Sequence, residues 1–462
     1  MIRLFKHYVP HVVLLLGLID AILLVASAEI GWQVRVHQIG SGDVEFAQRL
    51  PQLLTFAAAL QLSLVAVGAY GVGSFLSLRF AAARLAVAVA LGVIFLSMIY
   101  FAVPALQVWR SNLFYSMIVA VVLLVATRAL LNRVLGGEAF KRRVIVMGAG
   151  ARAARIEALA AAPGAKFQVC EFIDMGEHGA VVANSIPRAE IGNLAGFVVD
   201  RRVGEVVLAL EERRNALPFQ DLLRVRTTGV SVSEIGAFLE RETGRIDLNS
   251  VSHSWLIFSD GFAAGRLLSS AGKRAFDIVV SLLLLVFALP VILVTAIAIK
   301  LESRGPAFYR QRRIGLFNEG FDIIKLRSMR QDAEVAGQAI WAAERDPRVT
   351  RIGRFIRKVR IDELPQCWSV LKGEMSFVGP RPERPQFVGD LERQLPFYAE
   401  RHMVKPGITG WAQINYPYGA SIEDARHKLE YDLYYAKNYS PFLDLLILLQ
   451  TLRVVLWPSG AR

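Results

Sequence analysis

The stretch Val9-Pro-His-Val-Val-Leu-Leu-Leu-Gly-Leu-Ile-Asp-Ala-Ile-Leu-Leu-Val-Ala-Ser-Ala28 decides the fold of the N-terminal third of this chain. It has the roughly 20 mostly apolar residues that a helix needs to cross a bilayer. Three similar runs follow it: Leu53–Tyr70, Leu85–Val103 and Leu113–Leu131. The first run lacks the small-residue cleavage pattern of a signal peptide. We therefore predict a domain of four transmembrane helices over residues 1–140.

The composition agrees with a membrane protein. The 462 residues are 54% hydrophobic and carry a formal net charge of +13. The charge could indicate nucleic-acid binding, but the sequence has no zinc-finger, helix-turn-helix or aromatic RNA-binding signature. An anionic membrane surface and phosphorylated substrates explain the charge, so we expect no nucleic-acid partner. Cys170 and Cys367 show no metal-binding or disulfide pattern.

Basic residues in the short connections predict the orientation of these helices, because Lys and Arg are retained on the cytoplasmic side. These basic residues fall into two groups on opposite sides of the membrane, and the larger group places both ends of the four-helix domain in the cytoplasm. It contains Arg3, Lys6, Arg79, Arg84, Arg128, Arg133, Lys141, Arg142 and Arg143, against Arg35, Arg49 and Arg110 on the other side.

A fifth apolar run, Ile278–Ile299, has Pro290 in its middle and basic residues on both sides. A spanning helix normally shows a charge asymmetry, and proline bends a helix by removing a hydrogen bond. We therefore favour a re-entrant helix over about 276–300, broken at Pro290, with a spanning helix as the alternative. The flanking basic residues are Lys273, Arg274, Lys300 and Arg304.

Residues 141–262 change to short β-branched runs that alternate with amphipathic helices, which predicts a cytoplasmic Rossmann-like α/β domain. The predicted strands are Arg143–Met147, Phe167–Ile173, Gly196–Val199, Glu205–Leu210 and Val230–Glu234. Gly148 and Gly150 follow the first strand, and Asp174 ends the second. Such residues can bind the phosphate and ribose of a nucleotide cofactor. The alternative is that the glycines only allow tight packing of strand and helix, and the sequence leaves both open.

The segment Ile361-Asp-Glu-Leu-Pro-Gln366 places two carboxylates directly behind a run of basic residues. A cationic region that ends in Asp-Glu suits a polyphosphate substrate, a divalent metal and a nucleophile together. A solvated turn capped by Asp362 is the alternative. Pro365 and Gly373 predict a short helix over Glu363–Lys372, whose positive end would keep Asp362 ionised. The basic residues are Arg348, Arg351, Arg354, Arg357, Lys358 and Arg360.

The chain from Lys273 onward resembles the bacterial sugar transferase family, the monotopic phosphoglycosyl transferases, in its larger four-helix form. Met1–Pro10 and Ser254–Phe262 resemble the exopolysaccharide branch found beside exosortase (PEP-CTERM) systems. Seven motifs in order carry the family resemblance over a catalytic domain of residues 263–462. They are Lys273–Asp277, Gly305–Gln311 with Gly315, Lys325–Met329, Asp346–Gly353, Asp362–Gln366, Val378–Glu383 and Pro406–Gln413.

The resemblance implies transfer of a sugar 1-phosphate from a UDP-sugar to undecaprenyl phosphate, which yields undecaprenyl-diphospho-sugar and UMP. This is the first membrane step of exopolysaccharide synthesis, at the cytoplasmic face of the bacterial inner membrane. The resemblance makes Asp362 the nucleophile of a covalent phosphosugar intermediate and Glu363 a ligand of Mg²⁺. It also assigns Arg357 and Arg381 to phosphate binding. A carboxylate nucleophile divides one displacement between two anions into two steps.

Other residues carry weaker expectations. Lys325 and Arg327 alternate with apolar residues, so on a strand they would share one face, either toward substrate or toward solvent. Gln413 is a candidate for substrate contact. We expect the remaining basic residues before Asp362 to contact lipid head groups or to stabilise the fold. The family usually has Ser-Pro at the re-entrant break, whereas this chain has Leu289 before Pro290, which puts the break in doubt.

Phe442–Trp457 looks amphipathic and is expected to lie on the cytoplasmic face of the bilayer. A non-catalytic membrane scaffold that senses nucleotides is the rival function. The sequence leaves open a homodimer through the membrane helices or the Rossmann-like domain, and it does not identify the sugar.

Overall fold

The computed structural model describes residues 2–4, 7–9, 11–40, 45–70, 78–139, 141–162, 165–176, 181–211, 217–249, 267–330, 348–417, 419 and 421–456. The chain divides into two compact units. One contains Tyr8–Thr243 and the other contains Gly244–Arg462. The predicted boundary at 262/263 and the segment Ser254–Phe262 lie outside the described residues.

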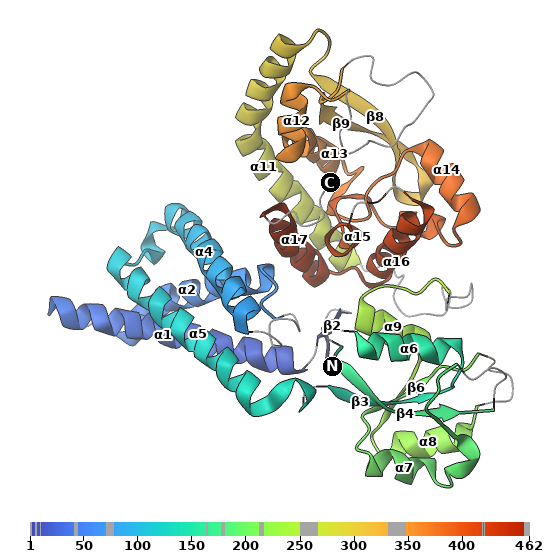
Figure 1. Ribbon diagram of the computed structural model, residues 1–462. Helices are drawn as coiled ribbons and strands as arrows, with labels where there is room; N and C mark the ends of the chain where they lie inside the picture. Colours follow the sequence, from blue (N-terminus) through green and yellow to red (C-terminus); the bar gives the residue numbers. More distant parts are fainter. Residues whose placement is uncertain are drawn as a thin grey trace. The chain divides into compact units, whose positions relative to one another are not determined.

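Long apolar helices form the first part of the chain (Figure 1). Helix α1 packs on α2 and α5, and α4 packs on the same two helices. Together with α11, described below, they are the five described helices that are long and apolar enough to cross a membrane. The elements are β1 (Ile2–Leu4), β2 (His7–Val9), α1 (His11–Ile39), α2 (Phe46–Ala66), α4 (Leu78–Ala102), η1 (Pro104–Leu106) and α5 (Arg110–Ala139).

A buried ion pair joins α1 to α5. Asp20 is fully buried and accepts hydrogen bonds from Arg128 Nη1 at 3.0 Å and Nη2 at 2.6 Å. The Tyr70 hydroxyl also donates to Asp20 at 2.8 Å, and Gln61 donates to that hydroxyl at 2.9 Å. Because the two charges pair with each other and Asp20 also accepts the Tyr70 hydroxyl, this apolar bundle tolerates both.

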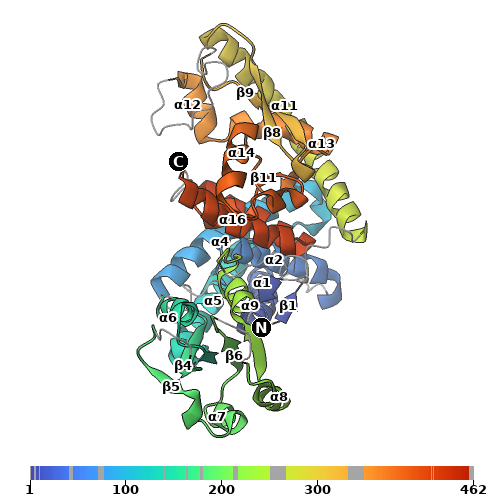
Figure 2. The ribbon, with the colours of Figure 1, turned by 90° about the vertical axis from the view of Figure 1, so that its right-hand side faces the viewer.

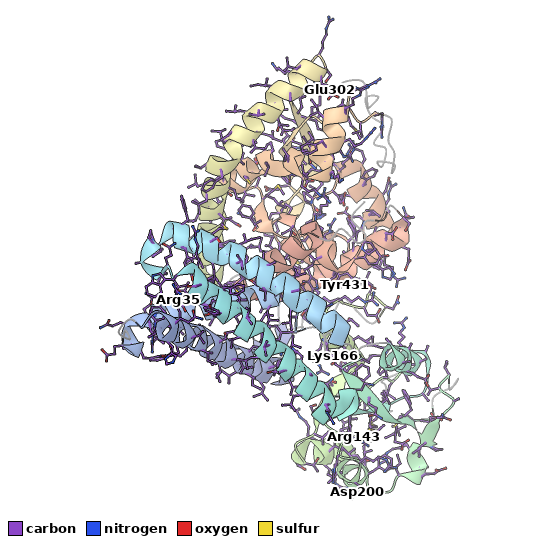
Figure 3. All side chains as sticks on the ribbon, turned by 60° about the vertical axis from the view of Figure 1, so that its left-hand side comes forward. Arg35, Arg143, Lys166, Asp200, Glu302 and Tyr431 are labelled. Atoms are coloured by element: carbon purple, nitrogen blue, oxygen red, sulfur yellow. The ribbon has the colours of Figure 1, made fainter. Side chains whose placement is uncertain are left out.

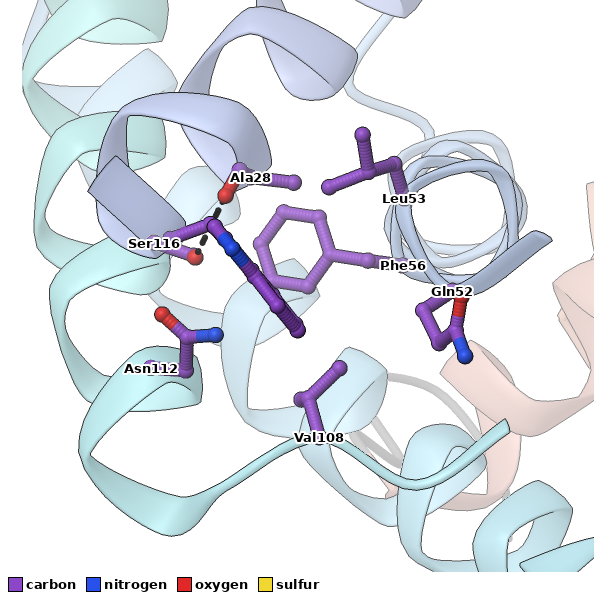
Figure 4. A pocket seen from close by; sticks show the side chains of 8 residues that line it. Ala28, Gln52, Leu53, Phe56, Val108, Asn112 and Ser116 are labelled. Carbon is purple, nitrogen blue, oxygen red and sulfur yellow. Dashed lines mark hydrogen bonds between the residues drawn. The ribbon is translucent and has the colours of Figure 1, made fainter. Parts of the chain in front are cut away.

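A small cavity lies between α1, α2 and α5 (Figure 4). The Ser116 hydroxyl on its wall donates to the carbonyl of Ala28 at 3.4 Å. Its volume of about 10 Å³ leaves space for about one water molecule and excludes a larger ligand. The lining residues are Ala28, Trp32, Gln52, Leu53, Phe56, Val108, Asn112 and Ser116.

Five parallel strands in the order β5-β4-β3-β6-β7 form the middle sheet. Helices α6 and α9 cover one face and α7 and α8 the other, as Figure 2 also shows. This is the doubly wound arrangement of a Rossmann-like domain, as predicted. The elements are β3 (Arg142–Met147), α6 (Ala151–Ala161), β4 (Phe167–Asp174), β5 (Ser185–Pro187), η2 (Arg188–Glu190), α7 (Leu194–Asp200), β6 (Glu205–Leu208), α8 (Phe219–Thr227), β7 (Ser231–Glu234) and α9 (Ile235–Thr243).

One predicted strand is wrong, and one strand was missed. Gly196–Val199 lies within helix α7, whose first turn is capped by the Asn193 side chain, which accepts a hydrogen bond from the Gly196 amide at 3.3 Å. A four-residue apolar run is compatible with a buried strand or with one side of a short helix. Here the hydrogen bond to the Asn193 cap stabilises the helix. The missed strand, β5, is only three residues long and contains a proline.

The second unit has one main core. Its largest fully buried side chains are Tyr434 and Tyr435, and Ile246 and Leu248 from the chain just after Thr243 join the same core. The elements are α11 (Leu267–Glu302), β8 (Phe308–Ile314), η3 (Leu316–Asn318), β9 (Gly320–Leu326), α12 (Arg351–Lys358), η4 (Ile361–Gln366), α13 (Cys367–Lys372), β10 (Ser376–Val378), α14 (Pro385–Gln394), η5 (Ala399–Met403), β11 (Gly407–Thr409), α15 (Trp411–Asn415), α16 (Ile422–Asn438) and α17 (Pro441–Leu456).

Helix α11 is continuous through Pro290, so the expected break in the helix is not seen there. Its two ends are held by the same unit. Near the first end, Lys273 pairs with Asp444 of α17. At the second end, Glu302 (Figure 3) accepts hydrogen bonds from the first amides of α12, with 2.8 Å to the Arg351 amide. Its outer side is apolar and exposed, as at Phe287, which is 76% exposed.

Helix α17 covers the described part of the predicted segment Phe442–Trp457. Asp444, which interrupts the apolar pattern of this segment, does not face solvent. It is buried, and besides Lys273 it accepts a hydrogen bond from the Tyr435 hydroxyl at 2.7 Å. The carboxylate therefore ties α17 to α11 and α16.

Candidate active site

Three segments that are far apart in the sequence meet at Glu363. Lys325 projects from β9, and its Nζ lies 3.0 Å from Glu363 Oε1. Arg381, in the loop after β10, donates from Nη2 to the same oxygen at 2.9 Å. Glu363 itself belongs to η4, which packs against β9. The structure thus brings together three of the residues that the sequence predicted for the site.

The cations keep Glu363 ionised. Burial acts to raise the pKa of this carboxyl, but Arg381, Lys325 and Arg360 outweigh it and lower the pKa well below its usual range. Burial has the opposite effect on the ammonium group of Lys325: it lowers the pKa of Lys325, and the charge of Glu363 partly offsets this. Arg360, expected to contact lipid head groups or to stabilise the fold, lies with Nη1 3.8 Å from Glu363 Oε2.

Asp362 has a different environment from its neighbour. It is 8% exposed, and among the described residues its Oδ1 has no hydrogen-bond partner. Burial and the charge of Glu363 raise its pKa, while Lys325, Arg357 and Arg360 act in the opposite direction. A buried carboxylate oxygen without a partner is costly, and such atoms in native proteins often have a chemical role.

The local helix differs from the prediction. Residues Ile361–Gln366 form a 3-10 helix, and α-helical geometry begins only at Cys367. In an α-helix, the amide of residue 365 would bond to the carbonyl of Ile361, and proline has no such hydrogen. Asp362 therefore lies inside the first turn rather than at an N-cap. Burial and Glu363 raise the pKa of Asp362, and the charges that lower it come from Lys325, Arg357 and Arg360.

The loop that carries Arg381 is fixed along its backbone. Each carbonyl from Pro380 to Glu383 accepts a hydrogen bond from a different donor. The donors are the Gly407 amide, Arg401 Nη2, Arg313 Nη1 and the Ile314 amide, at 2.9, 2.9, 2.9 and 3.0 Å. A loop held at four consecutive carbonyls fixes the backbone position from which the Arg381 side chain reaches Glu363.

Arg401 is itself held by a buried ion pair. Its Nη2 lies 2.7 Å from Asp432 Oδ2, and both side chains are at most 5% exposed. Its Nη1 also donates to the Tyr398 hydroxyl at 2.8 Å. Arg401 and Arg313 could not be found from the sequence, because they act by binding backbone carbonyls that only the fold brings near them.

Glycines let the loops around Arg381 approach each other. A Cβ atom on Gly379 would lie 2.2 Å from the Lys405 carbonyl oxygen, and one on Gly407 would lie 2.1 Å from the Gly379 nitrogen. Strands β10 and β11 pair in parallel beside this contact. The glycines of the motifs Val378–Glu383 and Pro406–Gln413 therefore serve backbone packing under the site.

Two predicted substrate residues have other partners. Arg327 is buried and donates to the carbonyls of Arg304 and Ser303 at 2.8 and 2.9 Å, so it does not share the environment of Lys325. It follows the last residue of β9, where strand alternation no longer applies. Gln413 donates to the carbonyl of Ile408 at 3.4 Å, and its buried Oε1 has no partner among the described residues.

The donor chemistry fits a magnesium ion. Among the described residues, no group of three or more His, Cys, Asp or Glu side chains could hold a metal. Mg²⁺, however, is usually bound through one or two carboxylates together with substrate phosphates and water. Asp362 Oδ1, which no described residue binds, and the adjacent Glu363 carboxylate can supply those ligands.

The three residues predicted to bind a nucleotide lie at the carboxyl edge of the middle sheet. Gly148 and Gly150 form the turn from β3 to α6. Asp174 ends β4 and accepts a hydrogen bond from the Gly176 amide at 2.9 Å.

Two segments of the chain match known protein families. Residues 268–458 match the family "Bacterial sugar transferase", and residues 65–230 match "CoA-binding domain". Neither family match tests the resemblance to the exosortase-associated branch, which stays a prediction.

Three relatives illustrate the similarity. The UDP-N-acetylgalactosamine-undecaprenyl-phosphate N-acetylgalactosaminephosphotransferase of Aeromonas hydrophila is 44% identical over 245 residues, 52% of this chain and 56% of that protein. The undecaprenyl-phosphate glucose phosphotransferase of Komagataeibacter xylinus is 46% identical over 41% of this chain and 36% of that protein. The UDP-glucose:undecaprenyl-phosphate glucose-1-phosphate transferase of Caulobacter vibrioides is 42% identical over 41% of this chain and 71% of that protein.

The matches thus span about half or less of the first two relatives but more than two thirds of the third. The family match over 268–458 includes the segments that meet at Glu363, since Lys325, Glu363 and Arg381 all lie within it. The chain belongs to the bacterial sugar transferase family.

Proposed function

We propose that this chain transfers a sugar 1-phosphate from a UDP-sugar to undecaprenyl phosphate, the first membrane step of exopolysaccharide synthesis. The observation that carries the proposal is the contrast between adjacent carboxylates. Glu363 is bound by Lys325 and Arg381, whereas Asp362 keeps a buried oxygen that has no hydrogen-bond partner in the described part of the chain. The names of the three relatives, which specify undecaprenyl phosphate and a glucose or N-acetylgalactosamine donor, support the same reaction.

In the first step, a carboxylate oxygen of Asp362 attacks the sugar-bearing phosphorus of the UDP-sugar. A bond forms between that oxygen and phosphorus, the bond from phosphorus to the bridging oxygen breaks, and UMP leaves with the electron pair. The product is a phosphosugar ester of Asp362. Cations near the carboxylates, Arg357 and Arg381 among them, offset the repulsion between a carboxylate and a diphosphate.

In the second step, a phosphate oxygen of undecaprenyl phosphate attacks the same phosphorus. The bond to Asp362 breaks and restores the free carboxylate, and undecaprenyl-diphospho-sugar leaves. Mg²⁺ held by Glu363, with Asp362 Oδ1 nearby, would supply charge neutralisation on the phosphate oxygens when bound.

We also propose a membrane arrangement, in which the contacts of α11 bear on one helix. We place α1, α2, α4 and α5 across the inner membrane and both following domains, residues 141–262 and 263–462, in the cytoplasm. A helix that carried the chain across the bilayer would hold its ends on opposite sides. Both ends of α11 bind the same compact unit, through Lys273 and Glu302, while its outer side is apolar and exposed. Because α11 is unbroken at Pro290, this supports a helix that keeps both ends on the cytoplasmic side and buries its apolar outer side in that face of the bilayer.

A groove beside α11 suits the acceptor lipid. It has a volume of about 420 Å³, and its described lining is mostly apolar and includes the charged residue Lys300. An isoprenoid chain fits apolar walls, and an ammonium group fits its phosphate. Phe308 in the groove pairs with Leu326, the neighbour of Lys325, so the groove adjoins the hairpin that carries a site residue. The lining is Leu293, Ala296, Ile297, Lys300, Pro306, Ala307 and Phe308.

UMP release tests the proposed function. We expect the purified full chain in nanodiscs to release UMP from at least one member of a panel of UDP-sugars. Release should require Mg²⁺, and net lipid product should require undecaprenyl phosphate. A matched preparation of Glu363→Gln should be far less active, because it loses the carboxylate that pairs with Lys325 and Arg381. Wild-type protein that is folded but inactive with every sugar would favour the rival function, a non-catalytic scaffold.

The pH dependence tests the state of Asp362, which must be ionised to attack. Arg357 lowers the pKa of Asp362, so Arg357→Gln should raise that pKa further. The acid limb of the pH–rate profile should therefore move to higher pH, with activity lost earlier as the pH falls. Loss of a phosphate contact would only lower the plateau. Arg354→Gln, an exposed arginine on the same helix, is the control, and an unmoved limb in Arg357→Gln would contradict this assignment.

A further inference from the structure

The turn from β3 to α6 is the place where a domain of this topology usually binds phosphate. β3 is the first strand of the doubly wound sheet, and α6 is the helix that follows it. Free amides at that helix end, together with the helix dipole, attract an anion. The match to a CoA-binding domain covers this turn. A phosphorylated cofactor would therefore be expected to place a phosphate here.

In this chain a carboxylate already occupies that position. Glu211, which follows β6 on the same edge of the sheet, accepts a hydrogen bond through Oε1 from the Arg152 backbone amide at 2.8 Å. Its Oε2 lies 3.4 Å from Arg152 Nε. The amide of the second residue of α6 thus has an internal anion as its partner, and the Arg152 guanidinium is held beside the same carboxylate.

The space beside Gly150 is also filled. A Cβ atom on Gly150 would lie 3.0 Å from Glu211 Cγ and 3.1 Å from its Oε1. Glycine at this position usually lets a pyrophosphate approach the backbone. Here it lets the Glu211 side chain approach instead. A phosphate at this turn would need Glu211 to leave and would otherwise be repelled by its charge.

The other two residues of the nucleotide pattern have internal roles as well. Gly148 has φ +124°, and a Cβ there would lie 2.6 Å from the Ala209 carbonyl oxygen, so glycine is required by packing against the end of β6. Asp174, the candidate ribose ligand, accepts a hydrogen bond from the Gly176 amide within its own turn. The pattern is therefore accounted for by contacts within the chain.

We propose that Glu211 is a built-in substitute for a ligand phosphate, which closes the β3–α6 turn to coenzyme A and to other phosphorylated nucleotides. The residues at this turn do not fit the cofactor that the family description names. The middle domain accordingly keeps the Rossmann-like framework without its phosphate site. This inference does not depend on the proposed transferase activity.

Hydrogen–deuterium exchange of α6 in the full chain tests the proposal, because peptides from 151–161 report on this turn alone. In wild-type protein, coenzyme A and inorganic phosphate should leave exchange in α6 unchanged. In Glu211→Ala, the first amides of α6 should exchange on the order of fivefold faster, because a helix cap is lost. Inorganic phosphate should then slow them again by occupying the vacated position.

Two further variants keep the result interpretable. Glu211→Gln retains the size of the side chain and removes its charge, so it should show the phosphate effect even if Glu211→Ala disturbs the domain. Glu190→Ala, an exposed glutamate of the same domain outside the turn, should behave as wild type. Protection of α6 by coenzyme A in wild-type protein, or no response to phosphate in either Glu211 variant, would overturn the proposal.

Discussion

Asp362→Asn is expected to reduce UMP release by roughly 10⁴-fold or more, as loss of a covalent nucleophile does in other enzymes. The amide has nearly the same shape as the carboxyl but cannot form the phosphosugar ester. Folding should be little affected, because burial already raises the pKa of Asp362 and its Oδ1 accepts no hydrogen bond from the described residues that a neutral side chain would lose. The measurement is UMP release from the UDP-sugar that the wild-type chain uses.

A matched control separates chemistry from folding. Asp322→Asn changes an exposed aspartate on β9, paired only loosely with Arg312 at 3.6 Å, and should keep nearly full activity. With donor labelled at the sugar-bearing phosphate, label should remain on wild-type protein when acceptor lipid is omitted and be absent from Asp362→Asn. More than a tenth of wild-type release by a folded Asp362→Asn protein would exclude Asp362 as the nucleophile.

The sequence was sufficient for the elements whose pattern is long and regular. The apolar runs of about 20 residues predict helices α1, α2, α4 and α5, because hydrophobic length alone distinguishes them. The strand–turn–helix from Arg142 to Ala161 and the parallel sheet follow from the alternation of short β-branched runs with helices. The short run Gly196–Val199 was assigned wrongly because its state depends on the capping by Asn193.

The candidate site was only partly predictable, for a different reason. The motifs indicate which residues carry charge, but the fold decides which charges meet. Lys325 binds Glu363, whereas Arg327, two residues later, donates its hydrogen bonds to backbone carbonyls. Arg401 acts on the site through a main-chain oxygen, which leaves no pattern in the sequence. For the same reason, the glycines of the middle domain suggested a phosphate site that Glu211 fills.

Breaking the ion pair between Asp20 and Arg128 should have the largest effect on stability. Arg128→Met leaves a fully buried carboxylate whose remaining hydrogen-bond donor among the described residues is the Tyr70 hydroxyl. Removal of one partner from a buried pair costs about 3–5 kcal/mol. We expect the free energy of unfolding of the helical bundle in mixed micelles to fall by that amount. An ionisable residue among apolar helices is tolerated only when its counter-charge is present.

The double variant Asp20→Leu with Arg128→Met distinguishes a missing partner from lost packing. Because it removes both charges, it should recover most of the lost stability, as apolar replacement of a buried pair often does. Arg133→Met, at an exposed arginine on the same helix, should lie within about 0.5 kcal/mol of wild type. If Arg128→Met were as stable as Arg133→Met, the pair would not hold α1 against α5. If the double variant were no better than the single one, packing rather than charge would account for the loss.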